Sequence, residues 1–149
     1  NLGAEIGVET GRFSKFLCTI NPNLKLYAVD AWGQPDEGIY NKAKGRLASF
    51  NCQIVKDAPM NAVKMFADKS LDFVYINAYH DFKNAMDDIK EWSKKVRKGG
   101  IVAGHGYSTD SQRQPPGVKR VVNKWVKKNK IRPLFIFEKN DPPTWFYVK

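Results

Sequence analysis

A glycine-containing turn near the start of the chain constrains the fold more than any other feature. Residues 4–8 have the pattern of a short strand, and Gly7 and Gly11 then bracket a tight turn. An apolar stripe at helical spacing follows, made of Phe13, Phe16, Leu17 and Ile20. A strand, a glycine turn and a helix N-terminus in this order let backbone N–H groups approach a ligand closely. We therefore expect a ligand site at this turn.

The first position of the turn motif carries an acid, which distinguishes it from a dinucleotide site. A dinucleotide fingerprint places glycine there to make room for a pyrophosphate. This chain instead reads E-x-G-x-x-x-G from Glu5 to Gly11, and a carboxylate suits a ligand with a cationic amino group. The pattern resembles motif I of the class I S-adenosylmethionine-dependent methyltransferases, whose ligand has an ammonium, a sulfonium and a ribose. The motif alone leaves open an ordinary turn between a strand and a helix.

The rest of the chain alternates between strand and helix patterns. Further strands are expected at 25–29, 53–56, 71–78, 101–103, 134–138 and 144–148. Helices are expected at 36–50, from Pro59 with Asp57 as its cap, from Asp81 until Lys98-Gly99-Gly100 ends it, and over 118–126. The run at 71–78 is mostly apolar, as is typical of a strand covered on both faces. Residues 139–143 join the last two strands as a hairpin.

Five β/α units that end in an antiparallel pair define the predicted architecture. We expect an α/β, Rossmann-like fold: an open, mostly parallel seven-stranded sheet with helices on both faces and a C-terminal antiparallel hairpin. Residues 1–149 are expected to form a single S-adenosylmethionine-dependent methyltransferase domain. Because the chain opens almost inside its first strand, we expect a preceding segment to be missing or short.

Ligands of such sheets bind outside the carboxyl ends of the strands, which selects the cofactor residues. Asp30 ends the second strand, and in the family the matching acid binds both ribose hydroxyls. Asp57 ends the third, where the family often contacts the adenine amino group; helix capping is an equally good explanation. Trp32 either covers the ribose or adenine or fills the loop. The resemblance implies S-adenosylmethionine as cofactor and S-adenosylhomocysteine as product, held by Glu5, Gly7, Gly11, Phe13, Asp30, Trp32, Asp57 and Asn77.

The second half of the chain is similar to a subgroup of small-molecule and sugar O-methyltransferases. That subgroup commonly reads F-V-x-I-D-x-x-H-D/S-Y and then G-G-x-x-A-G-H-D-Y, and residues 73–82 and 99–107 follow these patterns. Two acids of the subgroup are replaced here, by Asn77 and by Gly106 in Gly104-His105-Gly106-Tyr107. In related enzymes such carboxylates hold a divalent cation that activates the substrate hydroxyl. No metal is therefore expected at this spot; Asp81, Asp110 and the two histidines remain alternative ligands.

His80 and His105 are the only histidines, and each follows the carboxyl end of a strand. Imidazole titrates near neutrality and suits a general base, so both are candidate catalytic residues. Methyl transfer from a sulfonium needs little more than a deprotonated nucleophile held in line. The alternative is that each histidine orients a loop through a hydrogen bond.

The net charge of +10 invites a nucleic-acid interpretation, but its location argues against one. Between Lys90 and Arg132 there are thirteen Lys or Arg against Glu91 and Asp110. Most of these cations are expected on the face away from the cofactor, which favours solubility or a docking surface over a nucleic-acid substrate. The N-P-P-Y-type tetrapeptide of many nucleic-acid methyltransferases is also absent after the fourth strand.

The remaining features limit location and partners. No apolar run approaches the ~20 residues of a membrane span. Cys18 and Cys52 form no motif and are expected to be reduced core thiols, which favours a cytoplasmic location. The expected function is O-methylation of a small hydroxylated molecule or sugar. The alternative is a degenerate member that binds the cofactor or a partner without turnover, and a nucleic-acid methyltransferase ranks below both. The oligomeric state and the acceptor stay undetermined.

Overall fold

The computed structural model describes residues 1–33, 37–77, 82–108, 117–139 and 142–149. Within these residues a seven-stranded sheet has the order β3-β2-β1-β4-β5-β7-β6. The strands are β1 (Leu2–Ile6), β2 (Lys25–Asp30), β3 (Cys52–Lys56), β4 (Leu71–Ile76), β5 (Val96–Gly104), β6 (Phe135–Phe137) and β7 (Thr144–Val148). Strands β1 to β5 pair in parallel, whereas β7 is antiparallel to both β5 and β6. The predicted fold, including its C-terminal antiparallel pair, is confirmed.

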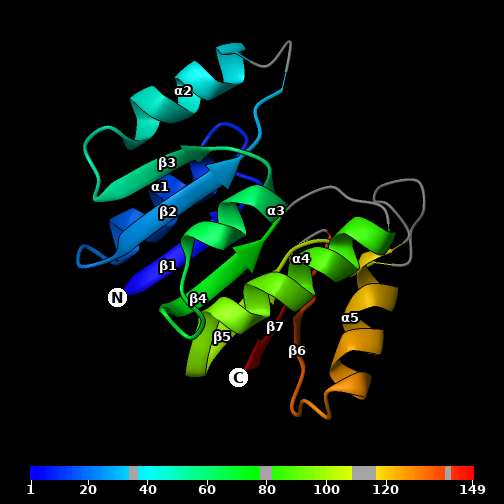
Figure 1. Ribbon diagram of the computed structural model, residues 1–149. Helices are drawn as coiled ribbons and strands as arrows, with labels where there is room; N and C mark the ends of the chain where they lie inside the picture. Colours follow the sequence, from blue (N-terminus) through cyan, green and yellow to red (C-terminus); the bar gives the residue numbers. More distant parts are fainter. Residues whose placement is uncertain (34–36, 78–81, 109–116, 140–141) are drawn as a thin grey trace.

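Helices lie on both faces of this sheet (Figure 1). They are α1 (Arg12–Ile20), α2 (Glu37–Leu47), α3 (Pro59–Ala62) with the 3-10 turn η1 (Val63–Met65), α4 (Phe82–Lys95) and α5 (Val118–Lys128). Helices α3, α4 and α5 cover one face, while α1 and α2 lie on the opposite one. None of the helices in the described ranges is long and apolar enough to cross a membrane.

The main core lies between the sheet and the helices α3, α4 and α5. Val74 of β4, Val102 of β5 and Tyr147 of β7 point into it and are buried. Opposite them, α4 contributes Ile89 and Trp92, and α5 contributes Val121 and Val122. These helical residues recur at the spacing of an amphipathic helix, so each helix buries one apolar stripe against the strands.

The other face of the sheet is covered over only part of its width. Helices α1 and α2 pack over β1, β2 and β3, as the clusters around Cys18 and Ala43 show. Phe73 and Tyr75 of β4 therefore remain half-buried, and the prediction of a strand covered on both faces is wrong for them. The predicted stripe of α1 also needs correction, because Ser14 and Cys18 are buried whereas Phe16 and Ile20 are exposed.

Several element boundaries differ from the sequence-based ones. Helix α4 ends at Lys95 and β5 begins at Val96, so Lys98-Gly99-Gly100 lies inside a strand and does not end the helix. A Cβ at Gly100 would come within 2.5 Å of the Asp72 backbone oxygen, at an irregularity of the β4–β5 pairing. A glycine pair that looks like a helix terminator is thus required by a close approach of two strands.

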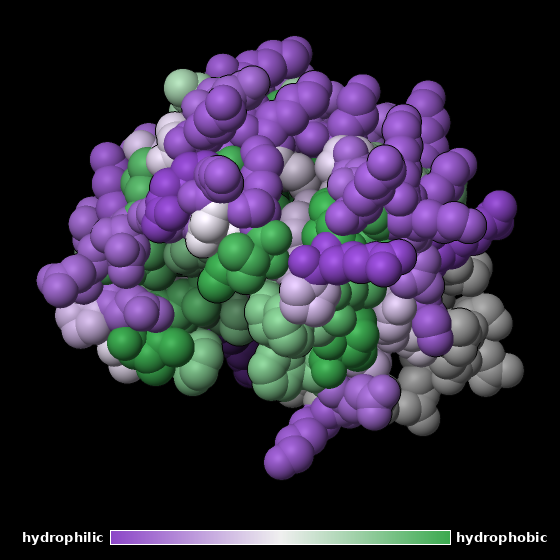
Figure 2. All heavy atoms as spheres, turned by 90° about the horizontal axis from the view of Figure 1, so that it is seen from below, coloured by the Kyte–Doolittle hydropathy of each residue, from purple (hydrophilic) through white to green (hydrophobic). Residues whose placement is uncertain are grey.

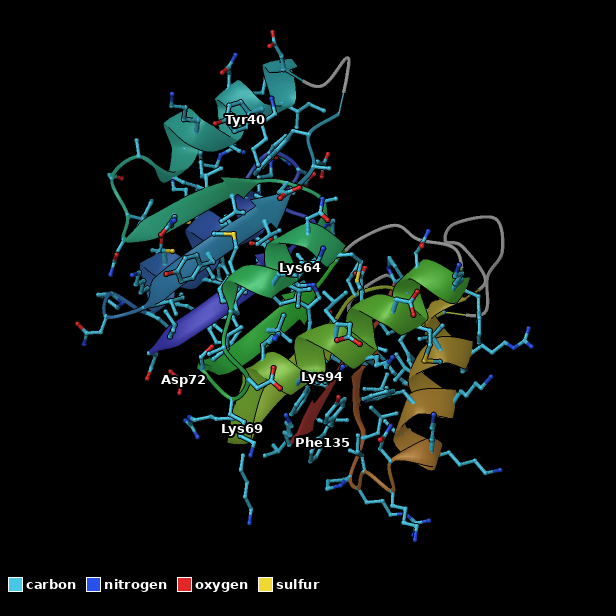
Figure 3. The ribbon with its side chains drawn as sticks, viewed as in Figure 1. Tyr40, Lys64, Lys69, Asp72, Lys94 and Phe135 are labelled. Carbon is cyan, nitrogen blue, oxygen red and sulfur yellow. The ribbon has the colours of Figure 1, made fainter. Side chains whose placement is uncertain are left out.

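Three cations near the amino ends of β4 and β5 are paired with acids. Lys94 contacts Glu91 at 2.6 Å, Lys95 contacts Asp68 at 2.7 Å and Arg97 contacts Asp72 at 2.6 Å. Figure 3 shows Lys69, Lys94 and Asp72 together at this edge of the sheet. A ligand is expected at the carboxyl ends of the parallel strands. The edge with these ion pairs is the opposite one.

Candidate functional site

The carboxyl ends of β2, β1, β4 and β5 form one continuous edge. Backbone hydrogen bonds extend the strand pairing past the last strand residues. Gly7 N–H donates to the Val29 oxygen at 2.9 Å, and Asn77 N–H donates to the Ile6 oxygen at 2.7 Å. His105 N–H donates to the Ile76 oxygen at 3.1 Å. The structure thus brings the predicted residues Gly7, Asn77 and His105 to neighbouring positions along this edge.

The turn between β1 and α1 has a left-handed backbone at alternate residues. The φ angles are +85° at Gly7, +52° at Glu9 and +73° at Gly11. A Cβ at Gly11 would meet the Leu47 Cδ1 at 3.2 Å and the Ala43 Cα at 3.3 Å. Both glycines are therefore demanded by the backbone, and Glu9 adopts a conformation that L residues other than glycine rarely take.

Asp30 holds this turn through its carboxylate. Its Oδ2 accepts hydrogen bonds from the N–H groups of Val8 at 2.9 Å and Glu9 at 2.8 Å. Its Oδ1 accepts one from the N–H of Trp32 at 3.1 Å. Because Asp30 is only partly buried, the same carboxylate faces both the turn and the ligand edge. This arrangement fixes the position of an acid that could also bind ligand hydroxyls.

Glu5 lies beneath the turn and is 1% exposed. Ser14 donates a hydrogen bond to its Oε2, whereas Oε1 has no partner among the described residues. Burial raises the pKa of Glu5 from 4.5 to about 8, with a smaller contribution from the nearby charge of Asp30. Glu5 thus supports the first turn of α1 and can meet a cationic ligand group only through its buried, unpartnered oxygen.

Trp32 is buried and fills the loop after β2. Its Nε1 donates to the Glu9 oxygen at 2.8 Å, and its ring lies edge-on to that of Tyr40 at 5.1 Å. Only 4% of the residue is exposed. Trp32 is thus tied to the turn and fills the loop, and its predicted contact with the ribose or adenine stays a prediction.

Asp57 and Phe13 lie at the borders of the edge. The Asp57 carboxylate accepts hydrogen bonds from the Ala58 N–H at 2.7 Å and from Asn61 at 3.2 Å. The capping residue of α3 is Ala58, so the prediction of Asp57 as the cap is off by one residue. Phe13 packs its ring against that of Tyr75, with a centroid distance of 4.3 Å.

At the carboxyl ends of β4 and β5, positions 77 and 106 carry no carboxylate, whereas the similar O-methyltransferase subgroup has an acid at each. Asn77 donates a long hydrogen bond, 3.4 Å, from Nδ2 to the Gly7 oxygen. His105 is half-buried, and burial lowers its pKa below the ordinary value of 6.5. Gly106 has a φ of +84°, a backbone conformation that disfavours other residues. The other predicted catalytic residue, His80, lies outside the described residues, as do Asp81 and Asp110.

Two residues of this edge escaped the sequence analysis. Ser14 forms the hydrogen bond to Glu5, and Glu9 supplies both a strained backbone and the acceptor for Trp32. The position of Ser14 in the first turn of the helix, three residues after Gly11, was the available signal. In the part of the chain that the structure describes, no group of three or more His, Cys, Asp or Glu side chains could hold a metal ion.

Comparison with known proteins identifies the class. A family profile described as "Methyltransferase domain" matches residues 4–107, which include every described residue of the edge up to Tyr107. The chain belongs to this methyltransferase family. Together with the fold, this makes it a class I methyltransferase that uses S-adenosylmethionine as its cofactor.

Solved structures share the fold at low sequence identity. A Staphylococcus aureus protein assigned as a caffeoyl-CoA O-methyltransferase has a TM-score of 0.76 and 19% identity, over 100% of this chain and 76% of that one. An O-methyltransferase from Bacillus cereus, in complex with S-adenosylhomocysteine, has a TM-score of 0.72 and 16% identity, over 99% and 74%. A Clostridium thermocellum protein assigned as an rRNA methylase gives 0.73 and 14%, over 100% and 88%. No curated protein sequence matches the chain.

Proposed function

We propose that this chain transfers a methyl group from S-adenosylmethionine to an oxygen of a small hydroxylated molecule or sugar. The observation that carries the proposal is the turn at residues 7–11, held by the Asp30 carboxylate at the carboxyl ends of β1 and β2. When bound, the cofactor supplies a methyl group activated by a sulfonium. The experiments below test the cofactor site and the acceptor separately.

The residues of the turn fit such a cofactor. Gly7 is half-buried and leaves its backbone without a Cβ at the turn, whereas Gly11 is buried and lets the turn pack closely against α2. Asp30 keeps free acceptor capacity for one ribose hydroxyl, because a carboxylate has about four lone-pair sites and three are used here. The amino group of the cofactor is assigned to the unpartnered Oε1 of Glu5, which becomes charged as it gains that partner.

His105 acts as the base for the acceptor hydroxyl. A pKa lowered by burial leaves its imidazole neutral at pH 7, with one ring nitrogen able to accept a proton. The residue follows β5 directly, and its backbone is fixed by the hydrogen bond to Ile76. His80 is kept as the second candidate base on sequence grounds alone.

The reaction proposed here needs no divalent cation. Asn77 offers one amide oxygen, and Gly106 offers no side chain, where the resembling subgroup carries two acids. Hard cations such as Mg²⁺ are held by carboxylates, so this pair is a poor ligand set. Removing the proton from the acceptor then falls to an imidazole and not to a Lewis acid.

A small acceptor is favoured over a nucleic acid by the placement of the cations. Lys94, Lys95 and Arg97 lie at the edge opposite the ligand and are paired with acids there. A nucleic-acid substrate is bound through cations beside the site of methylation; Arg12, which follows the turn, and Lys119 and Arg120 at the start of α5 are among the described cations near that edge. The relatives assigned as O-methyltransferases agree with this choice, whereas the relative assigned as an rRNA methylase is the reason to include RNA in the test.

The decisive experiment combines calorimetry and turnover. S-adenosylhomocysteine is expected to bind the purified protein, and a panel of phenols, sugars and RNA is expected to give methylated product only from the small hydroxyl compounds. Activity should persist in EDTA and fall about 100-fold or more in His105→Ala. Methylated RNA, or activity that EDTA abolishes and Mg²⁺ restores, would overturn the proposal. Binding without any product would assign the chain to the non-catalytic alternative.

A further inference from the structure

Three cations gather where helices α4 and α5 begin. The Lys119 Nζ lies 5.4 Å from the centre of the Tyr107 ring. The Arg120 guanidinium and the Lys124 Nζ lie 5.0 Å and 5.5 Å from the centre of the Phe82 ring. Contacts of this length between a cation and an aromatic face are attractive. The two rings therefore help to hold the three cations together, and we call Lys119, Arg120 and Lys124 the α5 cation group.

The α5 cation group lies beside the proposed base, His105. Val118, the first residue of α5, lines a small cavity together with His105. Tyr107, whose ring carries one cation of the group, follows His105 by two residues. Helices α4 and α5 begin in close contact, because a Cβ at Gly117 would meet the Phe82 Cα at 3.3 Å. The group thus lies at the end of the sheet where the acceptor is proposed to bind.

No acid neutralises the α5 cation group in the part of the chain that the structure describes. None of its three members takes part in an ion pair there, in contrast to Lys94, Lys95 and Arg97. Residues 117–132 contain seven Lys or Arg and no Asp or Glu, so they carry a large share of the net charge of +10. An anionic group of a ligand would therefore meet unpaired positive charge at the start of α5.

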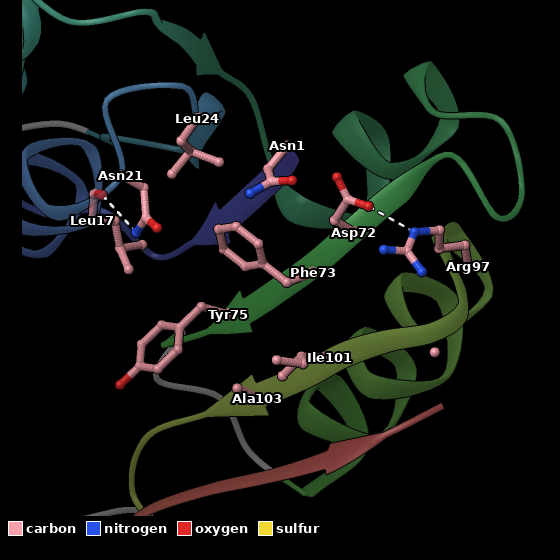
Figure 4. Close-up of a pocket in the computed structure, with 11 residues that line it drawn as sticks. Asn1, Leu17, Asn21, Leu24, Asp72, Phe73, Tyr75, Arg97, Ile101 and Ala103 are labelled. Carbon is pink, nitrogen blue, oxygen red and sulfur yellow. Dashed lines mark hydrogen bonds and ion pairs between the residues drawn. The ribbon is translucent and has the colours of Figure 1, made fainter.

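The groove beside α1 differs from the start of α5 in its charge (Figure 4). It has a volume of about 410 Å³, and Phe73 and Ile101 are part of its floor. The cation that lines it, Arg97, is already paired, with its Nε 2.6 Å from the Asp72 Oδ1. Seen from below, the molecule shows uncovered apolar surface among hydrophilic side chains (Figure 2). An anionic ligand is therefore matched better by the α5 cation group than by this groove.

We propose that the α5 cation group binds a phosphate group of the methyl acceptor, and that the acceptor is a phosphorylated hydroxyl compound such as a sugar phosphate. This acceptor is the one of the proposed methyl transfer, on which the assignment rests. A phosphate monoester carries about −1.5 to −2 charges at pH 7 and three acceptor oxygens. The Arg120 guanidinium can bind two of these oxygens at once, and Lys119 and Lys124 add point charges. A carboxylate, with one charge and two oxygens, would leave part of this group unpaired.

An RNA strand is the alternative anionic ligand for this helix. Its phosphates would contact cations along the whole of α5, because such binding depends on the number of phosphates that are neutralised. A single phosphate group would contact only the cations at the start of the helix. Lys128, the last residue of α5, distinguishes the two cases. It is exposed and lies about 14 Å along the helix from Lys119, too far for the same phosphate.

The first probe is inorganic phosphate, because it needs no match to the carbon skeleton of the acceptor. In NMR titrations it is expected to shift the amide signals of residues 117–124 and to bind ~tenfold more tightly than acetate. Lys119→Gln and Arg120→Gln should each weaken phosphate ~tenfold. Lys128→Gln removes the same charge from the same helix and should leave the affinity unchanged. In turnover assays, the phosphorylated form of a methylated sugar should have a kcat/KM ~tenfold or more above that of the unphosphorylated form.

Three results would overturn the proposal. They are equal binding of phosphate and acetate, equal effects of Arg120→Gln and Lys128→Gln on phosphate, and a kcat/KM that is no higher for the phosphorylated sugar. A single-stranded RNA that displaces phosphate and loses affinity equally in both variants would assign the helix to a nucleic acid. S-adenosylhomocysteine binding is measured on the unchanged protein. If it binds and phosphate does not, only the phosphate assignment fails; if it does not bind, the proposed function fails, and phosphate binding is still measured.

Discussion

At the carboxyl ends of β1 and β2, the polar side chains make several short hydrogen bonds to the backbone. At the carboxyl ends of β4 and β5, the polar side chain of Asn77 makes one long hydrogen bond. Asp30 accepts three backbone N–H groups, and Trp32 is bonded to the turn that Asp30 holds. On the other side, Asn77 makes a single 3.4 Å bond to that turn. The proposed cofactor side is thus built largely from backbone geometry, whereas the proposed acceptor side depends on single side chains.

The largest expected effect comes from the turn itself. Gly7→Val should weaken S-adenosylhomocysteine binding ~1000-fold, about 4 kcal/mol, because a β-branched residue at a φ of +85° displaces the backbone that meets the ligand. Isothermal titration calorimetry measures the change. Gly45→Ala is the matched control, because a Cβ there meets nothing within 4 Å. Unaltered affinity in Gly7→Val would mean that the cofactor binds elsewhere.

The two sides are also expected to respond oppositely to pH. Glu5 has a pKa of about 8 in the folded state against an ordinary 4.5, so between these values the folded state holds a proton that the unfolded state has released. The free energy of unfolding should therefore fall as pH rises from 4.5 to 8, by on the order of 4 kcal/mol. The pKa of His105 is lowered by burial, so the unfolded state binds a proton more readily there than the folded state. The contribution of His105 should therefore lower the free energy of unfolding as pH falls below 6.5.

Denaturant titrations of the ligand-free protein across this pH range test the sign. Glu5→Gln should flatten the upper part of the profile, and His105→Gln should flatten the part below pH 6.5. A Glu5→Gln protein whose stability still falls by the same amount between pH 5 and pH 8 would show that Glu5 is not the titrating group.

A smaller effect is expected from the carboxylate that ties the turn. Asp30→Ala should lower the free energy of unfolding by about 2 kcal/mol, because three backbone donors lose a charged acceptor in a partly buried place. Thermal and urea denaturation measure this loss. Asp57→Ala is the control at the end of the next strand, where only Ala58 and Asn61 are bonded, and should cost less than about 1 kcal/mol. An equal loss of unfolding free energy in Asp30→Ala and Asp57→Ala would show that Asp30 stabilises the turn no more than Asp57 stabilises the start of α3.

The smallest expected change is on the acceptor side. Gly106→Ala should lower the free energy of unfolding by about 1 kcal/mol, because its φ is +84°. Chemical denaturation measures it, and Gly33→Ala, at an open position without a left-handed φ, serves as the reference. A neutral Gly106→Ala would show that this backbone relaxes freely and that an acid could be accommodated there.

Local patterns in the sequence predicted the fold. They also predicted that Gly7, Gly11 and Asp30 lie together at the ends of β1 and β2, because a strand, a turn and a helix are encoded by neighbouring residues; that these residues bind the cofactor stays a prediction. The exposure of Phe16 and Ile20 could not be read in this way, since helical spacing identifies an apolar stripe but not whether another layer covers it. Gly100 was predicted to end a helix but lies inside β5. Glycine is required there because Asp72 of the neighbouring strand approaches closely, a contact that local sequence does not encode. The burial of Trp32 likewise depends on Tyr40 and Glu9, which come together only in the folded chain.

The order of the last strands bears on how the protein folds. Strand β7 lies between β5 and β6, although β6 precedes it along the chain. Before Thr144–Val148 docks, β5 has an open edge and β6 has no neighbour in this sheet. Such edges can pair with other chains. The β6–β7 pairing is local, whereas the β5–β7 pairing joins residues about forty positions apart. Closing the edge of β5 is thus a non-local step, and until it is complete aggregation can compete with folding.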